Sequence, residues 1–254
     1  MIQLVGLLGL VAFVAASLVV GLRVLVLATR TRQLPELAIS MSMLLSGAIG
    51  TGLLVLPLLV PDPSIEAAYY SFQAGSASNH IGFALLFLFV WRVFRPREVW
   101  AAGLFTVSTL VLWTGGIGTA IHVMPGGGIP GRDIPPDLWF WLSLCSRFVV
   151  YGWATFESFH YYAMLKRRLA LGLADPVVAD RFFYWGVCTS AVFCIWLNLA
   201  ARAAFMDLDW VLAVSDLVSA LLGFVVAGSL SLAFFPRKNA VENPEASADS
   251  EMRS

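Results

Sequence analysis

Residues 138–168 read LWFWLSLCSRFVVYGWATFESFHYYAMLKRR, and this stretch decides the fold. As a helix rising about 1.5 Å per residue, it is long enough to cross a bilayer once. Unlike an ordinary lipid-facing helix, it carries Arg147, Tyr151, Glu157, His160 and Tyr161 in its middle. An ionisable side chain at bilayer depth costs about 2.5–3.5 kcal/mol, so it usually faces a bundle interior and marks a functional position. We interpret the segment as the polar spine of a multi-helix membrane protein.

The composition of the whole chain indicates the same class. Of its 254 residues, 59% are hydrophobic and 13% are charged, whereas an average soluble domain is about 25% charged. The formal net charge of zero gives no reason to expect a nucleic-acid partner. The three cysteines, Cys145, Cys188 and Cys194, lie in apolar runs, so we expect buried, inert thiols and no disulfide framework.

Seven apolar stretches predict an all-α, polytopic fold with one domain over residues 1–236. We expect the spans at about 2–29, 36–60, 68–92, 98–122, 138–165, 178–205 and 210–235, each near the roughly 20 residues that a spanning helix needs. The first stretch lacks the positive start of a signal peptide, and we interpret it as a retained span. Prolines at 35, 63, 96 and 176, each with a carboxylate nearby, are typical of helix starts. Residues 237–254 are polar and acidic, so we expect a disordered cytoplasmic tail.

Basic residues predict the orientation. They gather in alternate connections, as Arg30, Arg32, Arg92, Arg95, Arg97, Lys166, Arg167, Arg168, Arg181, Arg237 and Lys238. The other connections hold only Arg132 and Arg202 among several aspartates. The positive-inside rule then places the N-terminus outside and the C-terminus in the cytoplasm. The compact chain with short loops favours a bacterial inner (plasma) membrane, with membrane lipids as its surroundings.

Small residues indicate where helices approach closely. Ser42, Ser46 and Gly50 follow one another at intervals of four, and Gly115, Gly116 and Gly118 cluster in the fourth span. Small residues at such spacings drive helix association in lipid. The Gly/Pro-rich loop 124–137 is either a plain connector or a lid over an outward-opening cavity.

Counting residues from the helix ends gives each polar side chain a depth. The predicted ligand-binding set lies in the outer half and comprises Asn79, His80, Arg147, Tyr151, Asn198 and Asp216. Arg147 and Asp216 have compatible depths for an ion pair, which would be either a structural clamp or part of a ligand site. The inner half holds Glu157 and His160, our candidates for a proton or switch site; we expect them, with Tyr161, on one helix face. Arg23 either meets Glu157 or extends to the lipid phosphates.

The sequence lacks the residue patterns that several kinds of cofactor binding and catalysis require. The histidines at 80, 122 and 160 lie at different depths, which argues against a bis-histidine haem, and no clustered His/Asp/Glu set predicts a metal site. No nucleophile elbow, P-loop or dinucleotide fingerprint occurs, so we expect no catalytic residues.

One short stretch is similar to a known family. Residues 216–224, DLVSALLGF, resemble the last helix of microbial rhodopsins, where an aspartate precedes Ser-Ala-Lys and Gly-Phe. Leu221 stands where that resemblance places the retinal lysine, and the only lysines, Lys166 and Lys238, fall in cytoplasmic positions. A covalent retinal is therefore excluded. Seven-helix sugar transporters share the topology but place prolines in several spans, unlike this chain.

These observations favour a membrane-embedded binding or sensory protein with an outward-facing polar cavity for a small or lipid-like ligand. A cytoplasmic protein partner is expected at Lys166, Arg167 and Arg168. The first alternative is a proton-coupled secondary transporter with His80, Glu157 and Asp216 as protonation sites. A lipid-modifying enzyme using His80 or His160 as a base and an assembly subunit without a ligand are the further alternatives.

Overall fold

The computed structural model describes residues 2–60, 62–127, 134–205 and 208–235. Helices make up the regular structure of these residues: α1 (Ile2–Thr31), α2 (Leu34–Ser42), η1 (Met43–Gly50), α3 (Thr51–Leu59), α4 (Ile65–Phe94), α5 (Val99–His122), α6 (Leu138–Leu169), α7 (Pro176–Ala204) and α8 (Asp209–Phe234). Here η1 is a π-helix that joins α2 to α3 in one continuous rod. The predicted tail 237–254 lies outside the described residues.

The fold is all-α, with six stretches long and apolar enough to cross a membrane. They lie in α1, in the α2–η1–α3 rod, and in α4, α5, α7 and α8. α6 is longer than any of them, at 32 residues, and its polar side chains make it less apolar.

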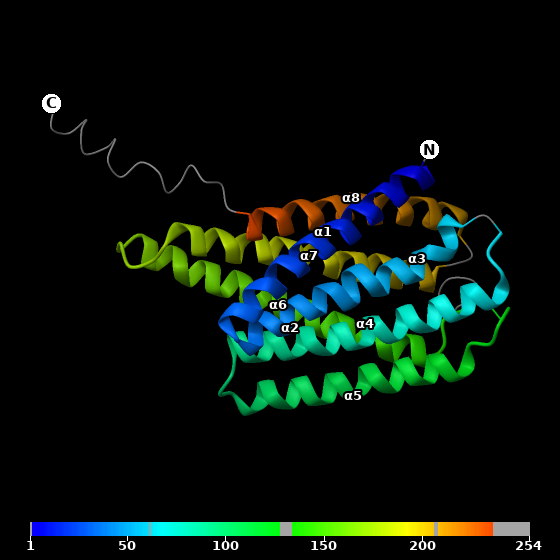
Figure 1. Ribbon diagram of the computed structural model, residues 1–254, viewed down its shortest axis with the longest axis horizontal. Helices are drawn as coiled ribbons and strands as arrows, with labels where there is room; N and C mark the ends of the chain where they lie inside the picture. Colours follow the sequence, from blue (N-terminus) through cyan, green and yellow to red (C-terminus); the bar gives the residue numbers. More distant parts are fainter. Residues whose placement is uncertain (1, 61, 128–133, 206–207, 236–254) are drawn as a thin grey trace.

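The rods pack side by side into a closed ring (Figure 1). α1 packs against the α2–η1–α3 rod on one side and α8 on the other; α7 packs between α8 and α6; and α4 joins α6 to the rod. α5 lies outside this ring, against α4 and α6. The hairpin of α6 and α7 extends past the neighbouring ends of α2, α4 and α5 (Figure 1).

Side-chain caps explain where three of the helices begin. The carboxylates of Asp137 and Asp175 accept hydrogen bonds from Phe140 N and Val177 N, both at 2.8 Å, at the starts of α6 and α7. At α4 the cap is Ser64, whose hydroxyl accepts from Ala67 N at 3.1 Å. Pro35 and Pro176 occupy first-turn positions as predicted. Pro63 and Pro96 do not: each precedes the residue that caps its helix, Ser64 and Glu98.

The π-helix η1 differs from the uniform helix predicted over residues 36–60. An i→i+5 pattern is rare and occurs mostly as short insertions within α-helices. Hydroxyl groups add bonds to the carbonyls of η1: Thr51 Oγ1 donates to Ser46 O at 2.8 Å, and Ser78 Oγ of α4 donates to Leu45 O at 2.7 Å. Because lipid offers the backbone no partner, these bonds allow the irregular segment to lie inside the bundle.

Small residues bring η1 and α4 into backbone contact. A Cβ added at Gly82 of α4 would lie 2.6 Å from both the nitrogen and the Cβ of Ser46, so only glycine fits there. A Cβ added at Gly115 of α5 would likewise lie 2.6 Å from the backbone nitrogen of Ser143. The close approaches that the small residues predicted are therefore present at Ser46 and Gly115.

We predict that Gly82→Ala destabilises the bundle by about 1–3 kcal/mol, because the added methyl group overlaps the backbone of η1. Gly103→Ala is the matched control, since a Cβ at Gly103 meets nothing within 4 Å. Thermal unfolding in detergent measures both variants. Equal melting temperatures for the two would contradict the close approach of α4 and η1.

Candidate functional site

Three side chains of α6, spaced four residues apart, lie at the end of α4. Glu157 is 1% exposed and accepts hydrogen bonds from Arg95 Nε at 2.7 Å and Arg95 Nη2 at 3.1 Å. One turn before it, Trp153 Nε1 donates to the same carboxylate at 3.3 Å. One turn after it, the Tyr161 hydroxyl donates to Phe94 O at 3.4 Å. We call Phe94, Arg95, Trp153, Glu157 and Tyr161 the inner junction.

The inner junction combines charge with aromatic packing. The ring of Tyr161 lies between Phe94 and Phe182 of α7, with centroids 5.2 and 5.6 Å away. The hydrogen bonds to Glu157 raise the pKa of Arg95, so its guanidinium stays charged. A bidentate Arg–carboxylate pair fixes geometry as well as charge, and here it fixes α6 against the end of α4.

Arg95 is the partner that the sequence did not predict for Glu157. α6 and α7 extend past the end of α4 (Figure 1). Glu157 therefore meets Arg95, the residue that follows the last residue of α4. The guanidinium of Arg23 lies 4.3 Å from the Phe235 ring centroid. Tyr161 shares the junction with Glu157 as the spacing predicted, whereas His160 is exposed and stacks on Phe156.

Asn79 and His80 belong to α4, and both are buried against neighbouring helices. His80 Nδ1 lies 2.6 Å from Ser76 O, and its Nε2 lies 3.1 Å from Ser143 Oγ of α6. Gly116 of α5 leaves the space that the imidazole fills. The amide oxygen of Asn79 lies against Gly50 of η1. Both ring nitrogens of His80 therefore have structural partners.

Arg147 lies among aromatic rings. Its guanidinium carbon is 4.6 Å from the Trp196 centroid and 5.2 Å from the Phe83 centroid, distances typical of cation–π contacts. Its Nε is enclosed and has no hydrogen-bond partner in the described part of the chain. The ring of Phe83 also packs edge-on against Tyr151, one turn further along α6, with centroids 6.1 Å apart. Phe83 thus joins Arg147 to Tyr151.

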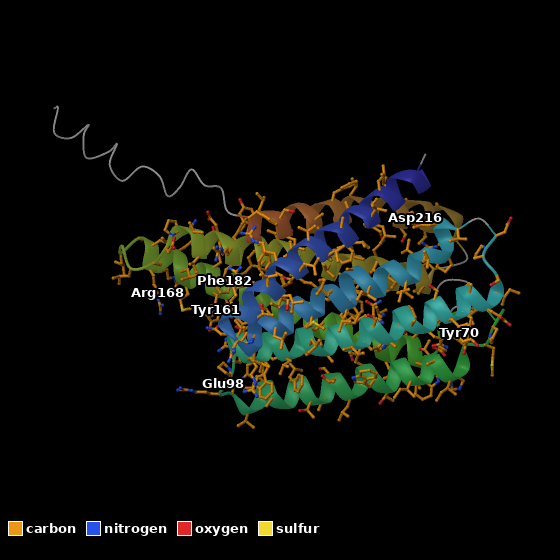
Figure 2. The ribbon with its side chains drawn as sticks, in the orientation of Figure 1. Tyr70, Glu98, Tyr161, Arg168, Phe182 and Asp216 are labelled. Atoms are coloured by element: carbon orange, nitrogen blue, oxygen red, sulfur yellow. The ribbon has the colours of Figure 1, made fainter. Side chains whose placement is uncertain are left out.

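The predicted ion pair between Arg147 and Asp216 is wrong. Asp216 accepts a hydrogen bond from Arg202 Nη1 at 2.7 Å instead. Asn198 lies beside this pair and donates from its amide to Ser215 O at 2.9 Å and to Ser219 Oγ at 2.8 Å. These contacts join α7 to α8 at the end of the molecule where Figure 2 labels Asp216. Arg202 was expected in a connection, yet it lies in the last turn of α7.

An interior cavity of about 50 Å³ lies where α1, α2, η1, α4, α6, α7 and α8 meet. Its lining contains no ionisable Asp, Glu, His, Lys or Arg side chain. The polar lining consists of Ser17, Ser42, Ser46, Tyr151, Cys188 and Thr189, and the remaining lining is mostly apolar. Ser17 and Ser42 are 2% and 3% exposed, and no hydrogen bond joins either hydroxyl to another described residue. Of the six predicted ligand-binding residues, Tyr151 is the one that lines this cavity.

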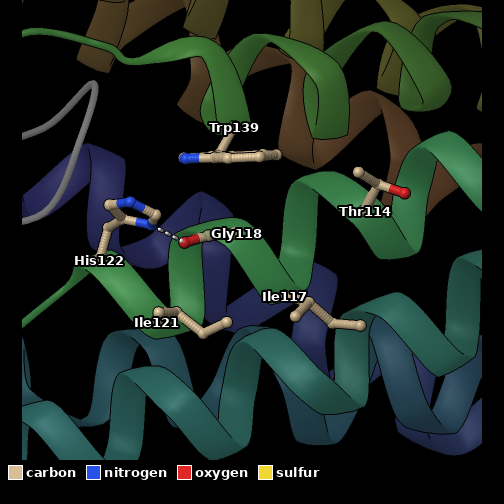
Figure 3. Close-up of a pocket in the computed structure, with 6 residues that line it drawn as sticks. All are labelled: Thr114, Ile117, Gly118, Ile121, His122 and Trp139. Carbon is tan, nitrogen blue, oxygen red and sulfur yellow. Dashed lines mark hydrogen bonds between the residues drawn. The ribbon is translucent and has the colours of Figure 1, made fainter.

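A second hollow of about 300 Å³ lies on the side of α5 and the start of α6 (Figure 3). Ile117, Ile121 and Trp139 make its lining apolar, while His122 Nδ1 is held by Gly118 O at 2.7 Å. Ile117 and Ile121 are exposed, so the hollow opens to the outside of the bundle. The loop 124–137, expected to be either a plain connector or a lid, includes residues 128–133, which lie outside the described ranges.

No protein-family model, no curated protein and no solved structure matches this chain. Its function is therefore inferred from its own side chains. They form three polar sets: the inner junction, the α7–α8 contacts, and the central set of Arg147, Tyr151 and the cavity. Among the residues that the structure describes, no group of three or more His, Cys, Asp or Glu could hold a metal ion.

The inner junction predicts unequal costs for its two charged partners. Arg95→Met leaves the buried Glu157 carboxylate without its cation, and we expect a loss of about 3–5 kcal/mol. Glu157→Gln is expected to cost less, because Arg95 is 32% exposed and can turn to solvent. Arg97→Met, at an exposed position in the same connection, is the control. Chemical denaturation would contradict this assignment if Arg95→Met matched Arg97→Met.

Proposed function

We propose that the protein crosses the inner membrane of a bacterium seven times, with α6 as the additional span, the N-terminus outside and the C-terminus in the cytoplasm. Three observations support this topology. α6 packs along α5 and α7 within the bundle. The start of α1 and the end of α8 lie at opposite ends, as an odd number of crossings requires (Figure 1). The basic residues follow the positive-inside rule.

We propose further that the protein is a membrane-embedded binding or sensory protein whose ligand occupies the interior cavity. The observation that carries this proposal is that the buried serines Ser17 and Ser42 line the cavity together with Trp185, whose Nε1 is enclosed without a partner among the described residues. A buried polar group normally has a hydrogen-bond partner, and its absence calls for an explanation such as a bound molecule. A volume of about 50 Å³ favours a small ligand over a lipid-like one.

α6 offers a route from the cavity to the cytoplasmic side. Tyr151 lines the cavity, and Trp153, Glu157 and Tyr161 follow on the same helix at the inner junction. Beyond the junction, Lys166, Arg167 and Arg168 are exposed on the projecting hairpin, where Figure 2 labels Arg168. The hairpin also exposes Leu171 and Leu173, by 72% and 73%. A cytoplasmic protein with an acidic, partly apolar surface would fit this hairpin.

A cavity-filling variant tests the binding proposal. Ser42→Val should remove the space for the ligand, while Ser231→Val, at an exposed position of α8, should not. Thermal stability is measured for both variants and the wild type across a panel of lipids, metabolites and pH values. We expect a compound that stabilises the wild type and the control and has no effect on Ser42→Val. If Ser42→Val only raises the melting temperature and every response to the panel stays the same, the cavity is a packing defect and the protein has no ligand there.

One observation supports the transporter alternative: Asp216 lies at the end of the molecule where Figure 2 labels it, whereas Glu157 lies one turn from Tyr161, which Figure 2 labels towards the other end. Proton coupling predicts that Asp216→Asn abolishes proton flux in liposomes. The binding proposal predicts no proton flux in the wild type. Proton flux that is present in the wild type and absent in Asp216→Asn would therefore favour the transporter over the binding protein. An enzyme using His80 as a base has less support, because both nitrogens of that ring have partners.

A further inference from the structure

The hydrogen-bonding groups around the interior cavity include donors that lack acceptors. Arg and Trp side chains donate hydrogen bonds and cannot accept them. In the part of the chain that the structure describes, Arg147 Nε, Trp185 Nε1 and Trp196 Nε1 are enclosed without a partner. Trp185 lines the cavity, and Trp196 stacks with Arg147. The residues Ser17 and Ser42, whose hydroxyls can also donate, line the same cavity.

The charge of this region is positive. Among the residues that the structure describes, no carboxylate lines the cavity. Arg147 lies one turn of α6 from Tyr151, which does line it. Phe83 connects the two, since its ring contacts both the Arg147 guanidinium and the ring of Tyr151 that lines the cavity. Asp216, the carboxylate that was expected to pair with Arg147, pairs with Arg202 instead. A buried cation without a counter-ion is expensive at this depth.

We propose that the cavity binds a small monovalent anion, such as chloride or nitrate, held by Trp185 Nε1 and by the hydroxyls of Ser17, Ser42 and Tyr151, with Arg147, one turn from Tyr151 on α6, as its counter-charge. This inference rests on the proposed function, because it assigns a chemical class to the ligand of the same cavity. An anion can accept hydrogen bonds from the donors that line the cavity, and its charge balances that of Arg147 beside them. A metal cation would meet no carboxylate and would be repelled by Arg147. The volume of about 50 Å³ admits a few water-sized groups and excludes large polyanions.

The test is the melting temperature of the purified full chain, titrated with chloride at constant ionic strength against gluconate, an anion too large for the cavity. We expect a saturable rise for the wild type with chloride and with nitrate, and no rise with sulfate. Arg147→Gln and Tyr151→Phe should each raise the half-saturating chloride concentration about tenfold or more. Ser231→Ala, at an exposed position of α8, should respond like the wild type.

Tyr151→Phe keeps the ring that packs on Phe83, and Ser17→Ala removes only one hydroxyl, so these two variants decide the result if Arg147→Gln does not fold. A wild-type protein with no saturable response to chloride or nitrate overturns the anion assignment. A response that is unchanged in Tyr151→Phe and Ser17→Ala overturns it as well, because the ion then binds elsewhere. After either of these results, a neutral compound that stabilises the wild type and not Ser42→Val would still identify the cavity as a ligand site. The anion assignment would then fail while the proposed function stands.

Discussion

Within a bilayer, a polar group has no water to bind, so it must find its partner inside the protein. The contacts between helices follow from this constraint. The hydroxyls of Thr51 and Ser78 donate hydrogen bonds to carbonyls of the π-helix. Asn198 of α7 donates to a serine of α8. Arg95 neutralises Glu157 where α6 passes the end of α4. Close backbone approaches at Gly82 and Gly115 bring α4 against η1 and α5 against α6.

α6 carries polar side chains to two of the three polar sets. Its C-terminal half fixes the end of α4 through a charged and aromatic junction, and its N-terminal half holds Arg147 and Tyr151 beside the cavity. The two sets differ in how well their polar groups are paired. At the inner junction the carboxylate of Glu157 has three donors, whereas at the cavity the described donors Arg147 Nε and Trp185 Nε1 have no acceptor. That contrast distinguishes a structural contact from a candidate binding site.

The sequence predicted the helices better than the contacts between them. Apolar length and capping residues such as Asp137 and Asp175 are local signals, and they predicted the all-α fold. Residue counting gives the depth of Arg147 and Asp216 but not their direction around each helix. α7 packs between α6 and α8, so Arg202 of α7 reaches Asp216 and Arg147 does not. The π-helix and the projection of α6 past α4, which brings Glu157 to Arg95, depend on packing and have no signal in the local sequence.

The central claim is that the polar side chains lining the cavity bind something other than the chain itself. An experimental density map of the purified protein, at a resolution that shows ordered water, tests this claim most directly. We predict density inside the cavity within hydrogen-bonding distance of the Ser17, Ser42 and Tyr151 hydroxyls. A cavity closed by side chains, with Ser17 and Ser42 bonded to carbonyls of their own helices, would contradict it.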